Sequence, residues 1–282
     1  MILVFGKTGQ VAMELQLLDD VIALGRDEAD LSNPVACANI IRDFSPKAVI
    51  NAAAYTAVDK AEEEEELATL INGEAPKFMA LACKALNIPF VHISTDYVFE
   101  GNGNTPWKNT SATAPQNAYG RSKLLGEEGI CASGATYAIL RTSWVFSSHG
   151  TNFVKTMLRL SNTHDSLSIV GDQIGGPTPA SDIAIACLKI TKHLQTDSSK
   201  SGIYHFTGAP DVSWVNFASE IFLLTGRSVK VTHIQSSDYP TPAKRPLNSR
   251  LDCTTTKNIF NVSRPNWRIG LKQMLKKLEV KL

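Results

Sequence analysis

The chain has 282 residues, and 28 lysine and arginine side chains nearly balance 27 aspartate and glutamate side chains. This length allows one large domain or two unequal ones, and a net charge of +1 gives no electrostatic reason to expect nucleic acid or an anionic membrane surface as a partner. No apolar run approaches the roughly 20 residues that span a bilayer. The first predicted strand begins at Met1 without a basic leader, so we expect a cytoplasmic protein. The five cysteines lack CxxC spacing, which favours buried free thiols.

Short apolar runs and amphipathic stretches alternate through the first half of the chain. The runs predict strands at residues 2–5, 21–24, 48–52, 90–94 and 137–143, and the stretches between them predict helices near 10–18, 34–44, 60–70, 74–87 and 117–132. Such alternation predicts an α/β fold, a Rossmann-type doubly wound parallel sheet with helices on both faces.

The first predicted strand runs directly into residues 6–12, which read GKTGQVA and precede a predicted helix. A glycine turn between a strand and a helix is the context in which a dinucleotide pyrophosphate binds backbone N–H groups. The pattern is GxxGxxA, and it lacks the GK[ST] of a P-loop. A plain glycine turn is the alternative. We predict cofactor contacts at Gly6, Thr8, Gly9, Gln10 and Val11.

The end of the second predicted strand bears on the choice of cofactor. Arg26 stands where an acidic residue would bind a ribose 2′-hydroxyl, and arginine suits a 2′-phosphate instead. This favours NADP(H), although a surface arginine without a ligand explains Arg26 equally well. Asp30 and Leu31 follow in a polar turn, and we predict that they border the adenine site.

The third predicted strand runs into small residues. Ala52, Ala53 and Ala54, followed by Tyr55, permit a flat ring to approach the backbone closely, and we predict that they contact the cofactor. Ordinary tight helix packing is the alternative reason for small residues at these positions.

Candidate catalytic residues follow the fourth predicted strand. Tyr119 and Lys123 are four residues apart and therefore share one face of a helix. A lysine ammonium near a phenol lowers the phenol pKa from about 10 and makes the tyrosine a usable proton donor or acceptor. Thr95 would hold a substrate carbonyl against the Tyr119 hydroxyl. A solvated Tyr–Lys pair is the alternative, because this spacing is common on helix surfaces.

Regular alternation stops near residue 148. Helices are predicted at 153–160, 214–225 and 268–279, between turn-rich segments and a proline-rich strip at 239–246. We therefore predict a dinucleotide-binding domain over residues 1–148. Residues 149–282 would form mainly a smaller α/β substrate-binding lobe, with some segments returning to the main domain.

Together these motifs resemble the extended, nucleotide-sugar-modifying branch of the short-chain dehydrogenase/reductase superfamily, and within it the dTDP-4-dehydrorhamnose reductase family. The resemblance runs from residue 1 to about 270. It rests on residues 51–59 (NAAAYTAVD), 92–99 (HISTDYVF), 141–146 (RTSWVF), 172–178 (DQIGGPT) and 245–249 (RPLNS). The chain departs from the family at Lys7 in the phosphate turn and at Ala12, which replaces a third glycine.

The family implies reduction of the C4 ketone of dTDP-4-dehydro-β-L-rhamnose to dTDP-L-rhamnose, a precursor of cell-surface polysaccharide. NADPH would be the cofactor, with NADH as an alternative. Tyr119 would be the general acid, Lys123 would lower the pKa of Tyr119 and bind the nicotinamide ribose, and Thr95 would hydrogen-bond the sugar oxygen.

The family also implies substrate contacts. Asp96, Tyr97 and Trp144 would contact the sugar, because they follow strands at the edge where ligands bind in open α/β sheets. A core aromatic is the alternative for Trp144. Arg245, or else Arg250, would bind the diphosphate, with a surface salt bridge as the alternative for each. We also expect Asn152 to be a helix cap.

Several alternatives to this reductase stay open. An epimerase or a 4,6-dehydratase belongs to the same branch, but Tyr97 stands where dehydratases carry a glutamate. A non-catalytic NADP-binding regulatory subunit, like that of methionine adenosyltransferase, is disfavoured by the intact Thr95, Tyr119 and Lys123. We predict no catalytic metal. A divalent ion at a subunit interface stays open, with Glu14 as a contributor, and so does the choice between monomer and homodimer.

Overall fold

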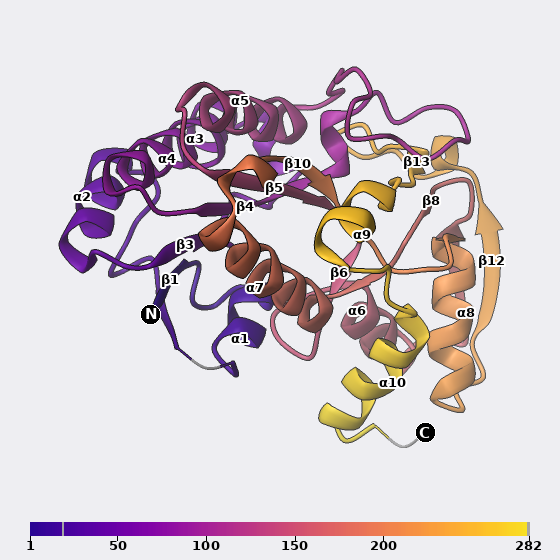
Figure 1. The fold of residues 1–282 in the computed structure, drawn as a ribbon. Coiled ribbons are helices and arrows are strands. Elements are labelled where there is room, and N and C mark those ends of the chain that lie inside the picture. The colour runs from indigo at the N-terminus through magenta and orange to yellow at the C-terminus, as the bar shows by residue number, and fades with distance from the viewer. Residues whose placement is uncertain (19, 281–282) are drawn as a thin grey trace.

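The computed structural model describes residues 1–18 and 20–280, and a six-stranded parallel sheet lies at its centre (Figure 1). Its strands are β1 (Ile2–Phe5), β2 (Val21–Leu24), β3 (Ala48–Asn51), β4 (Phe90–Thr95), β5 (Tyr137–Thr142) and β10 (Gly202–His205). They lie in the order β10-β5-β4-β3-β1-β2. The chain winds outward in both directions from β1, so ligand binding is expected at the carboxyl ends of β1 and β3.

Alternate residues of the strands enter two separate hydrophobic cores. Leu3 and Phe5 of β1 pack with α2 (Pro34–Phe44) and α4 (Ala75–Leu86), whereas Val4 between them packs with α1 (Gln10–Leu15) and α7 (Ala180–Thr196). Figure 1 shows these two helix layers on opposite faces of the sheet. Because both faces are covered, the strands are continuous apolar runs, as parallel sheets require. The predicted doubly wound α/β fold is confirmed.

The five strands predicted in the first half are confirmed to within one residue at each end. Two helix predictions need correction. α1 ends at Leu15 and not near residue 18: residues 16–18 form turns, in which Leu17 is exposed while Leu18 packs against the first core. The helices expected at 60–70 and 74–87 are joined: α3 (Glu65–Thr69) runs through a π-helical turn (Leu70–Glu74) into α4. Pro76, which has no N–H to donate, lies just after that turn.

Two elements of the second half, α7 and β10, were not predicted from the sequence. Ala184, Cys187 and Ile190 of α7 are buried against the sheet, and β10 pairs with β5 in parallel. The second half of the chain therefore contributes a strand and a covering helix to the central sheet. The prediction of buried thiols is confirmed for Cys37, Cys83, Cys187 and Cys253, while Cys131 is exposed, and all five are free.

The rest of the second half surrounds a third core, beside the carboxyl ends of the strands. Phe146, Phe217, Trp267 and Leu271 are buried in this core. Its helices are α6 (Phe153–Leu160), α8 (Trp214–Leu224) and α10 (Trp267–Lys277), and α9 (Thr254–Phe260) packs near β10. Its short strands are β6 (Val145–Phe146), β7 (Ser166–Val170), β8 (Ile174–Gly175), β9 (Thr178–Pro179), β11 (Val212–Ser213), β12 (Lys230–Ile234) and β13 (Asn248–Ser249).

A buried ion pair fixes the long helix α5 (Ala118–Ala132) to the sheet. Arg141 of β5 donates from Nη2 to Oε2 of Glu127 at 2.5 Å, and both side chains are 2% exposed. The hydroxyl of Ser94 in β4 donates to the other carboxylate oxygen of Glu127 at 2.5 Å. Together with Ser94, the pair thus ties β4, which ends in Thr95, and β5 to α5, which carries Tyr119 and Lys123.

We predict that Glu127→Gln lowers the free energy of unfolding by roughly 3–5 kcal/mol, because it leaves the Arg141 guanidinium buried without a countercharge. Urea unfolding followed by circular dichroism measures this change. The matched control is Glu65→Gln, which removes the half-exposed partner of Arg121 and is expected to change stability by less than about 1 kcal/mol. Equal effects of the two substitutions would show that the buried pair does not fix α5.

Candidate active site

A cavity of about 880 Å³ opens at the carboxyl ends of β1, β3, β4 and β5. Its wall contains every residue that the sequence analysis assigned to the cofactor, which are Gly6, Thr8, Gly9, Gln10, Val11, Arg26, Asp30, Leu31, Ala52, Ala53, Ala54, Tyr55, Tyr119 and Lys123. Thr95, Asp96, Tyr97 and Trp144 also line it. The topology therefore gathers residues from widely separated segments around one space.

The β1–α1 turn can approach the loop after β3 only because it contains glycine. Gly6 has φ +100°, a backbone region that residues with a Cβ rarely adopt, and a Cβ there would lie 2.8 Å from the backbone nitrogen of Ala53. Ala12 is buried against the sheet, so a small third residue is needed for packing. This cradle fits the elongated pyrophosphate of a dinucleotide, which needs backbone close to it.

The rim of this part of the cavity carries charge. Arg26 is 76% exposed, and its Nε donates to Oδ2 of Asp30 at 3.3 Å. Lys7, at the mouth of the turn, pairs with Glu28 at 3.3 Å. An exposed arginine held by only one partner retains further N–H donors for a phosphate.

Local capping places Tyr119 in the cavity wall. The Asn117 side chain accepts from the N–H of Gly120 at 2.7 Å and starts α5, which sets Tyr119 in the first turn of the helix. Thr95 ends β4, and its hydroxyl accepts from the N–H of Tyr97 at 3.2 Å. The Tyr97 ring then meets the Tyr119 ring edge to face, with centroids 5.4 Å apart. These contacts hold the Tyr119 hydroxyl at the end of the cavity where Thr95 lies.

The expected lowering of the Tyr119 pKa by Lys123 is wrong for this structure. Removal of its hydroxyl from water raises the pKa of Tyr119 to about 12, with the nearby Thr95 hydroxyl acting in the opposite direction. Lys123 is fully buried, and its Nζ lies 3.0 Å from Nε2 of His92 and 2.7 Å from the carbonyl oxygen of Ile93. The lysine thus binds to β4, and Tyr119 keeps its proton at neutral pH.

Four buried polar atoms in the cavity wall have no hydrogen-bond partner among the described residues. They belong to the side chains of Asp96, Thr142, Ser143 and Ser249. Buried polar groups are nearly always paired, so such a cluster marks a surface that a polar ligand completes. Sequence analysis missed the three hydroxyl residues. Thr142 ends β5 and Ser143 directly follows it, a placement that identifies them, whereas nothing local in the sequence identifies Ser249.

Trp144 closes the cavity on the side of the third core. It has φ +51°, unusual for a bulky residue, and its ring stacks on Trp214 of α8 with centroids 3.5 Å apart. The Trp214 indole donates to the side chain of Gln173 at 3.1 Å. Trp214 and Gln173 also line the cavity and were missed, because the chain folds back to place them there.

Arg245 is not among the residues that line the cavity, although its neighbour Pro246 is. Its Nη2 donates to Oδ2 of Asp59 at 2.6 Å, since Asp59 lies beside the proline-rich strip and neutralises the guanidinium. Arg250 likewise turns to its own loop, donating to the Asn248 side chain at 3.0 Å. Nη1 of Arg245 is buried without a hydrogen-bond partner among the described residues, so its assignment to a diphosphate stays a prediction beside the salt bridge.

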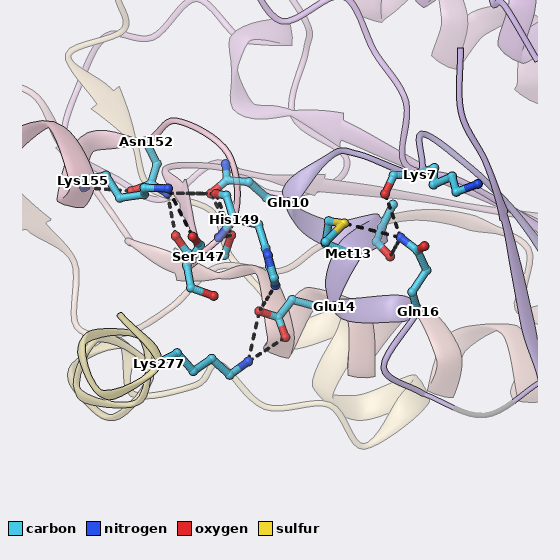
Figure 2. Close-up of polar contacts among 12 residues, drawn as sticks. Lys7, Gln10, Met13, Glu14, Gln16, Ser147, His149, Asn152, Lys155 and Lys277 are labelled. Carbon is cyan, nitrogen blue, oxygen red and sulfur yellow. Dashed lines mark hydrogen bonds and ion pairs between the residues drawn. The ribbon is translucent and has the colours of Figure 1, made fainter. Parts of the chain in front are cut away.

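Glu14 lies in α1 and Asn152 lies beside the start of α1, and both side chains are bonded to neighbouring residues of the protein (Figure 2). Asn152 caps α6 by accepting from the N–H of Lys155, as expected, and it donates to the Gln10 side chain at 2.9 Å. Glu14, the candidate metal contributor, receives the Lys277 ammonium at 3.1 Å. Within residues 1–18 and 20–280, three or more His, Cys, Asp or Glu side chains are nowhere grouped closely enough to hold a metal ion.

None of the helices in the described part of the chain is long and apolar enough to cross a membrane.

Comparisons with known proteins agree with this geometry. The family model described as RmlD substrate binding domain matches residues 1–280. A curated dTDP-4-dehydrorhamnose reductase of Sinorhizobium fredii is 42% identical over 282 residues, which cover 96% of this chain and 95% of that protein. A solved dTDP-4-dehydrorhamnose reductase from Clostridium acetobutylicum has a TM-score of 0.92 at 39% identity, with 99% of each chain covered. Another, from Bacillus anthracis in complex with NADP, has a TM-score of 0.90 at 32% identity, with 98% of each chain covered.

The Asp96 carboxyl makes the stability of the protein depend on pH. Burial raises the pKa of Asp96 to about 6 from an ordinary 3.8, with the nearby hydroxyls of Ser249 and Thr95 opposing the shift. A raised folded-state pKa adds stability that is complete below the unfolded-state pKa of 3.8 and is lost as the pH rises from there through the folded-state pKa of about 6. At neutral pH the ionised, buried carboxylate therefore destabilises the fold.

The Asp96→Asn variant cannot ionise at this position. We predict that the free energy of unfolding of the variant, minus that of the unchanged protein, is about 3 kcal/mol higher at neutral pH than at acidic pH. Urea unfolding of both proteins below the unfolded-state pKa, at about pH 3.5, and above the folded-state pKa, at about pH 7, measures this difference. Asp252→Asn is the control with the opposite sign, because bonds from Thr254 lower the pKa of Asp252. A stability difference for Asp96→Asn that does not change with pH would contradict the prediction.

Proposed function

The chain belongs to the RmlD substrate binding domain family, and from that premise we propose that it reduces the C4 ketone of dTDP-4-dehydro-β-L-rhamnose to dTDP-L-rhamnose with NADPH. One observation carries the proposal: a single cavity joins a glycine cradle and Arg26 at one end to Thr95, Tyr119 and Lys123 at the other. A dinucleotide lying along it would present its nicotinamide to a ketone held at Thr95. Relatives named dTDP-4-dehydrorhamnose reductase, and the one bound to NADP, support the same choice.

NADPH, when bound, supplies the hydride for the ketone carbon. Tyr119 then serves as the general acid, because its raised pKa keeps the phenol protonated until the ketone oxygen gains negative charge. A positioned proton donor of this kind contributes on the order of 10²–10⁴-fold in rate. Thr95 orients the ketone oxygen by a hydrogen bond from its hydroxyl. Lys123 would bind the nicotinamide ribose and stabilise the Tyr119 phenolate that remains.

The unpaired polar atoms beyond Thr95 suit a sugar. We assign Asp96, Thr142, Ser143 and Ser249 to its hydroxyl groups, since each hydroxyl can both donate and accept. Tyr97 and the Trp144–Trp214 stack provide an apolar side for the 6-deoxy end of the ring. Trp214 and Ser249 come from beyond residue 148, which supports a substrate-binding role for residues 149–282.

The product suits a precursor of cell-surface polysaccharide, and the proposed place of action is the cytoplasm, where NADPH is available. The rival function is a non-catalytic NADP-binding subunit. The protonated Tyr119 beside Thr95 favours the enzyme, because a binding scaffold needs no proton donor there.

We predict that Tyr119→Phe lowers kcat by about 10²–10⁴-fold and leaves NADPH affinity almost unchanged, because it removes only the proton donor. Absorbance of the reduced nicotinamide, with freshly generated dTDP-4-dehydro-β-L-rhamnose, measures turnover, and cofactor fluorescence measures binding. Tyr137→Phe is the control, since this tyrosine lies at the start of β5, away from the cavity. Undiminished turnover in Tyr119→Phe would contradict the mechanism. Absence of turnover in the unchanged protein, with NADP bound, would favour the regulatory subunit.

Arg26→Ala should lower kcat/KM for NADPH by roughly 10- to 100-fold, the worth of a hydrogen bond to a charged group, and leave kcat/KM for NADH unchanged. The reason is that only NADPH carries the 2′-phosphate that Arg26 is proposed to bind. Steady-state kinetics with both cofactors gives the ratio, and Arg42→Ala, on the far end of α2, is the control. An equal fall in kcat/KM with NADPH and with NADH would show that Arg26 does not bind the 2′-phosphate.

A further inference from the structure

A continuous chain of hydrogen bonds runs behind the cavity wall from the cofactor loop to Lys123. The N–H of Ala53 donates to Oδ1 of Asn51 at 3.1 Å, and Nδ2 of Asn51 lies 3.1 Å from Nδ1 of His92. Nε2 of His92 lies 3.0 Å from Nζ of Lys123, and Nζ donates to the carbonyl oxygen of Ile93 at 2.7 Å. Asn51, His92 and Lys123 are at most 1% exposed, so water does not compete for these bonds.

The direction of each bond follows from the first. Because Oδ1 of Asn51 accepts from Ala53, the Asn51 group facing His92 is the amide NH₂, which only donates. Nδ1 of His92 must then accept. Burial holds the pKa of His92 well below its usual range, so the ring is neutral and carries its single proton on Nε2. That proton points at Nζ of Lys123.

This direction decides the protonation state that fits Lys123. An ammonium has three N–H donors and no lone pair, so it would place a donor against the Nε2–H of His92. A neutral amine accepts from Nε2–H with its lone pair and still donates to Ile93. In a buried site an unmade or donor-to-donor contact is costly. The whole chain is satisfied at once only when Lys123 is an amine.

Building on the proposed function, we propose that Asn51 and His92 are positioning residues that hold Lys123 back against β4 as a neutral amine. Lys123 then takes up one proton from solvent, –NH₂ becoming –NH₃⁺, as its Nζ turns from His92 toward Tyr119. Protonation removes the lone pair that His92 binds and frees N–H donors for the ribose and the Tyr119 oxygen. The lysine thereby acquires its charge at the place where a phenolate forms.

The charged groups around α5 are consistent with an uncharged lysine. Glu127, one turn after Lys123, is neutralised by Arg141, and Glu65 of α3 is paired with Arg121. Glu62 accepts the N–H of Ala118 at the start of the helix. Asp96 and Tyr97, just beyond β4, lie in the cavity wall with Tyr119. Burial lowers the pKa of Lys123 to about 8, with Glu127 opposing the shift, so a neutral amine is accessible near physiological pH.

The first test reads the histidine tautomer directly in the unchanged protein, without substrate. Nitrogen-15 NMR of selectively labelled histidine distinguishes a protonated from an unprotonated ring nitrogen, and the His92→Gln spectrum assigns the signal. The expected result is a proton on Nε2 and none on Nδ1. A proton on Nδ1 would overturn the proposal whatever the turnover assay shows. This readout is therefore independent of the proposed reaction.

The second test uses a nearly isosteric substitution to reverse the donor–acceptor direction of the hydrogen bonds between residue 51, His92 and Lys123. Asn51→Asp keeps the acceptor for Ala53 and presents a second carboxylate oxygen to His92, which must then move its proton to Nδ1 and offer a lone pair to Lys123. This arrangement favours the ammonium form of Lys123. The pH at which kcat/KM falls on the alkaline side of its profile should therefore rise by roughly one to two units, the equivalent of one charge-assisted hydrogen bond. Calorimetry of NADP binding in two buffers should show correspondingly less proton uptake.

A control variant separates the effect of reversing the hydrogen bonds through His92 from the effect of the negative charge that Asn51→Asp adds. Asn51→Asp combined with His92→Phe keeps the carboxylate and interrupts the chain, so the shift relative to His92→Phe alone should vanish. A shift that persists without His92 would show that charge alone acts on Lys123, and this would overturn the role of His92. If the carboxylate variants fail to fold, the tautomer in the unchanged protein still decides the question.

Discussion

The buried contact between Glu127 of α5, Arg141 of β5 and Ser94 of β4 is the constraint on which the active site depends. Tyr119, Lys123 and Glu127 follow one another at intervals of four along α5 and share one helix face. Fixing Glu127 to the sheet therefore fixes the orientation of that face. Thr95 ends β4, next to Ser94, so the same contact sets how Tyr119 approaches Thr95. A buried ion pair is weak evidence for stability, and here its role is better understood as orientation.

The substrate end of the cavity is built from features that oppose stability. The ionised Asp96 carboxylate, the unpaired hydroxyls of Thr142 and Ser249 and the left-handed backbone of Trp144 each raise the free energy of the folded chain. They persist because the cores on both faces of the sheet and the Glu127–Arg141 contact determine the surrounding backbone. Their clustering at one end of one cavity is the expected result of selection for ligand binding, since a polar sugar would supply the missing partners.

Sequence reasoning succeeded where local pattern and sheet topology decide the structure. Apolar runs identified five strands, and the carboxyl ends of those strands brought Gly6, Ala52 and Thr95 to one edge. It failed where distant segments decide. The Tyr119–Lys123 spacing establishes a shared helix face, but the Lys123 partners are on β4, about thirty residues earlier, and they changed the predicted effect on Tyr119. Trp214 and Ser249 reach the cavity through the fold of the second half, and Arg245 pairs with Asp59, a partner 186 residues away in sequence.

The register of the sheet explains how the series of hydrogen bonds from Asn51 through His92 to Lys123 can form. Asn51 and His92 are directly paired across β3 and β4, two polar residues within strands that are otherwise largely apolar and covered on both faces. A polar side chain at such a position is costly unless every hydrogen bond is made, and each of these two has its partner on the next segment toward α5. Since the first donor, the N–H of Ala53, belongs to the cofactor-lining loop, displacement of that loop changes what Asn51 can offer to His92. Cofactor position and the proton on Lys123 are thus coupled through bonds that lie outside the cavity itself.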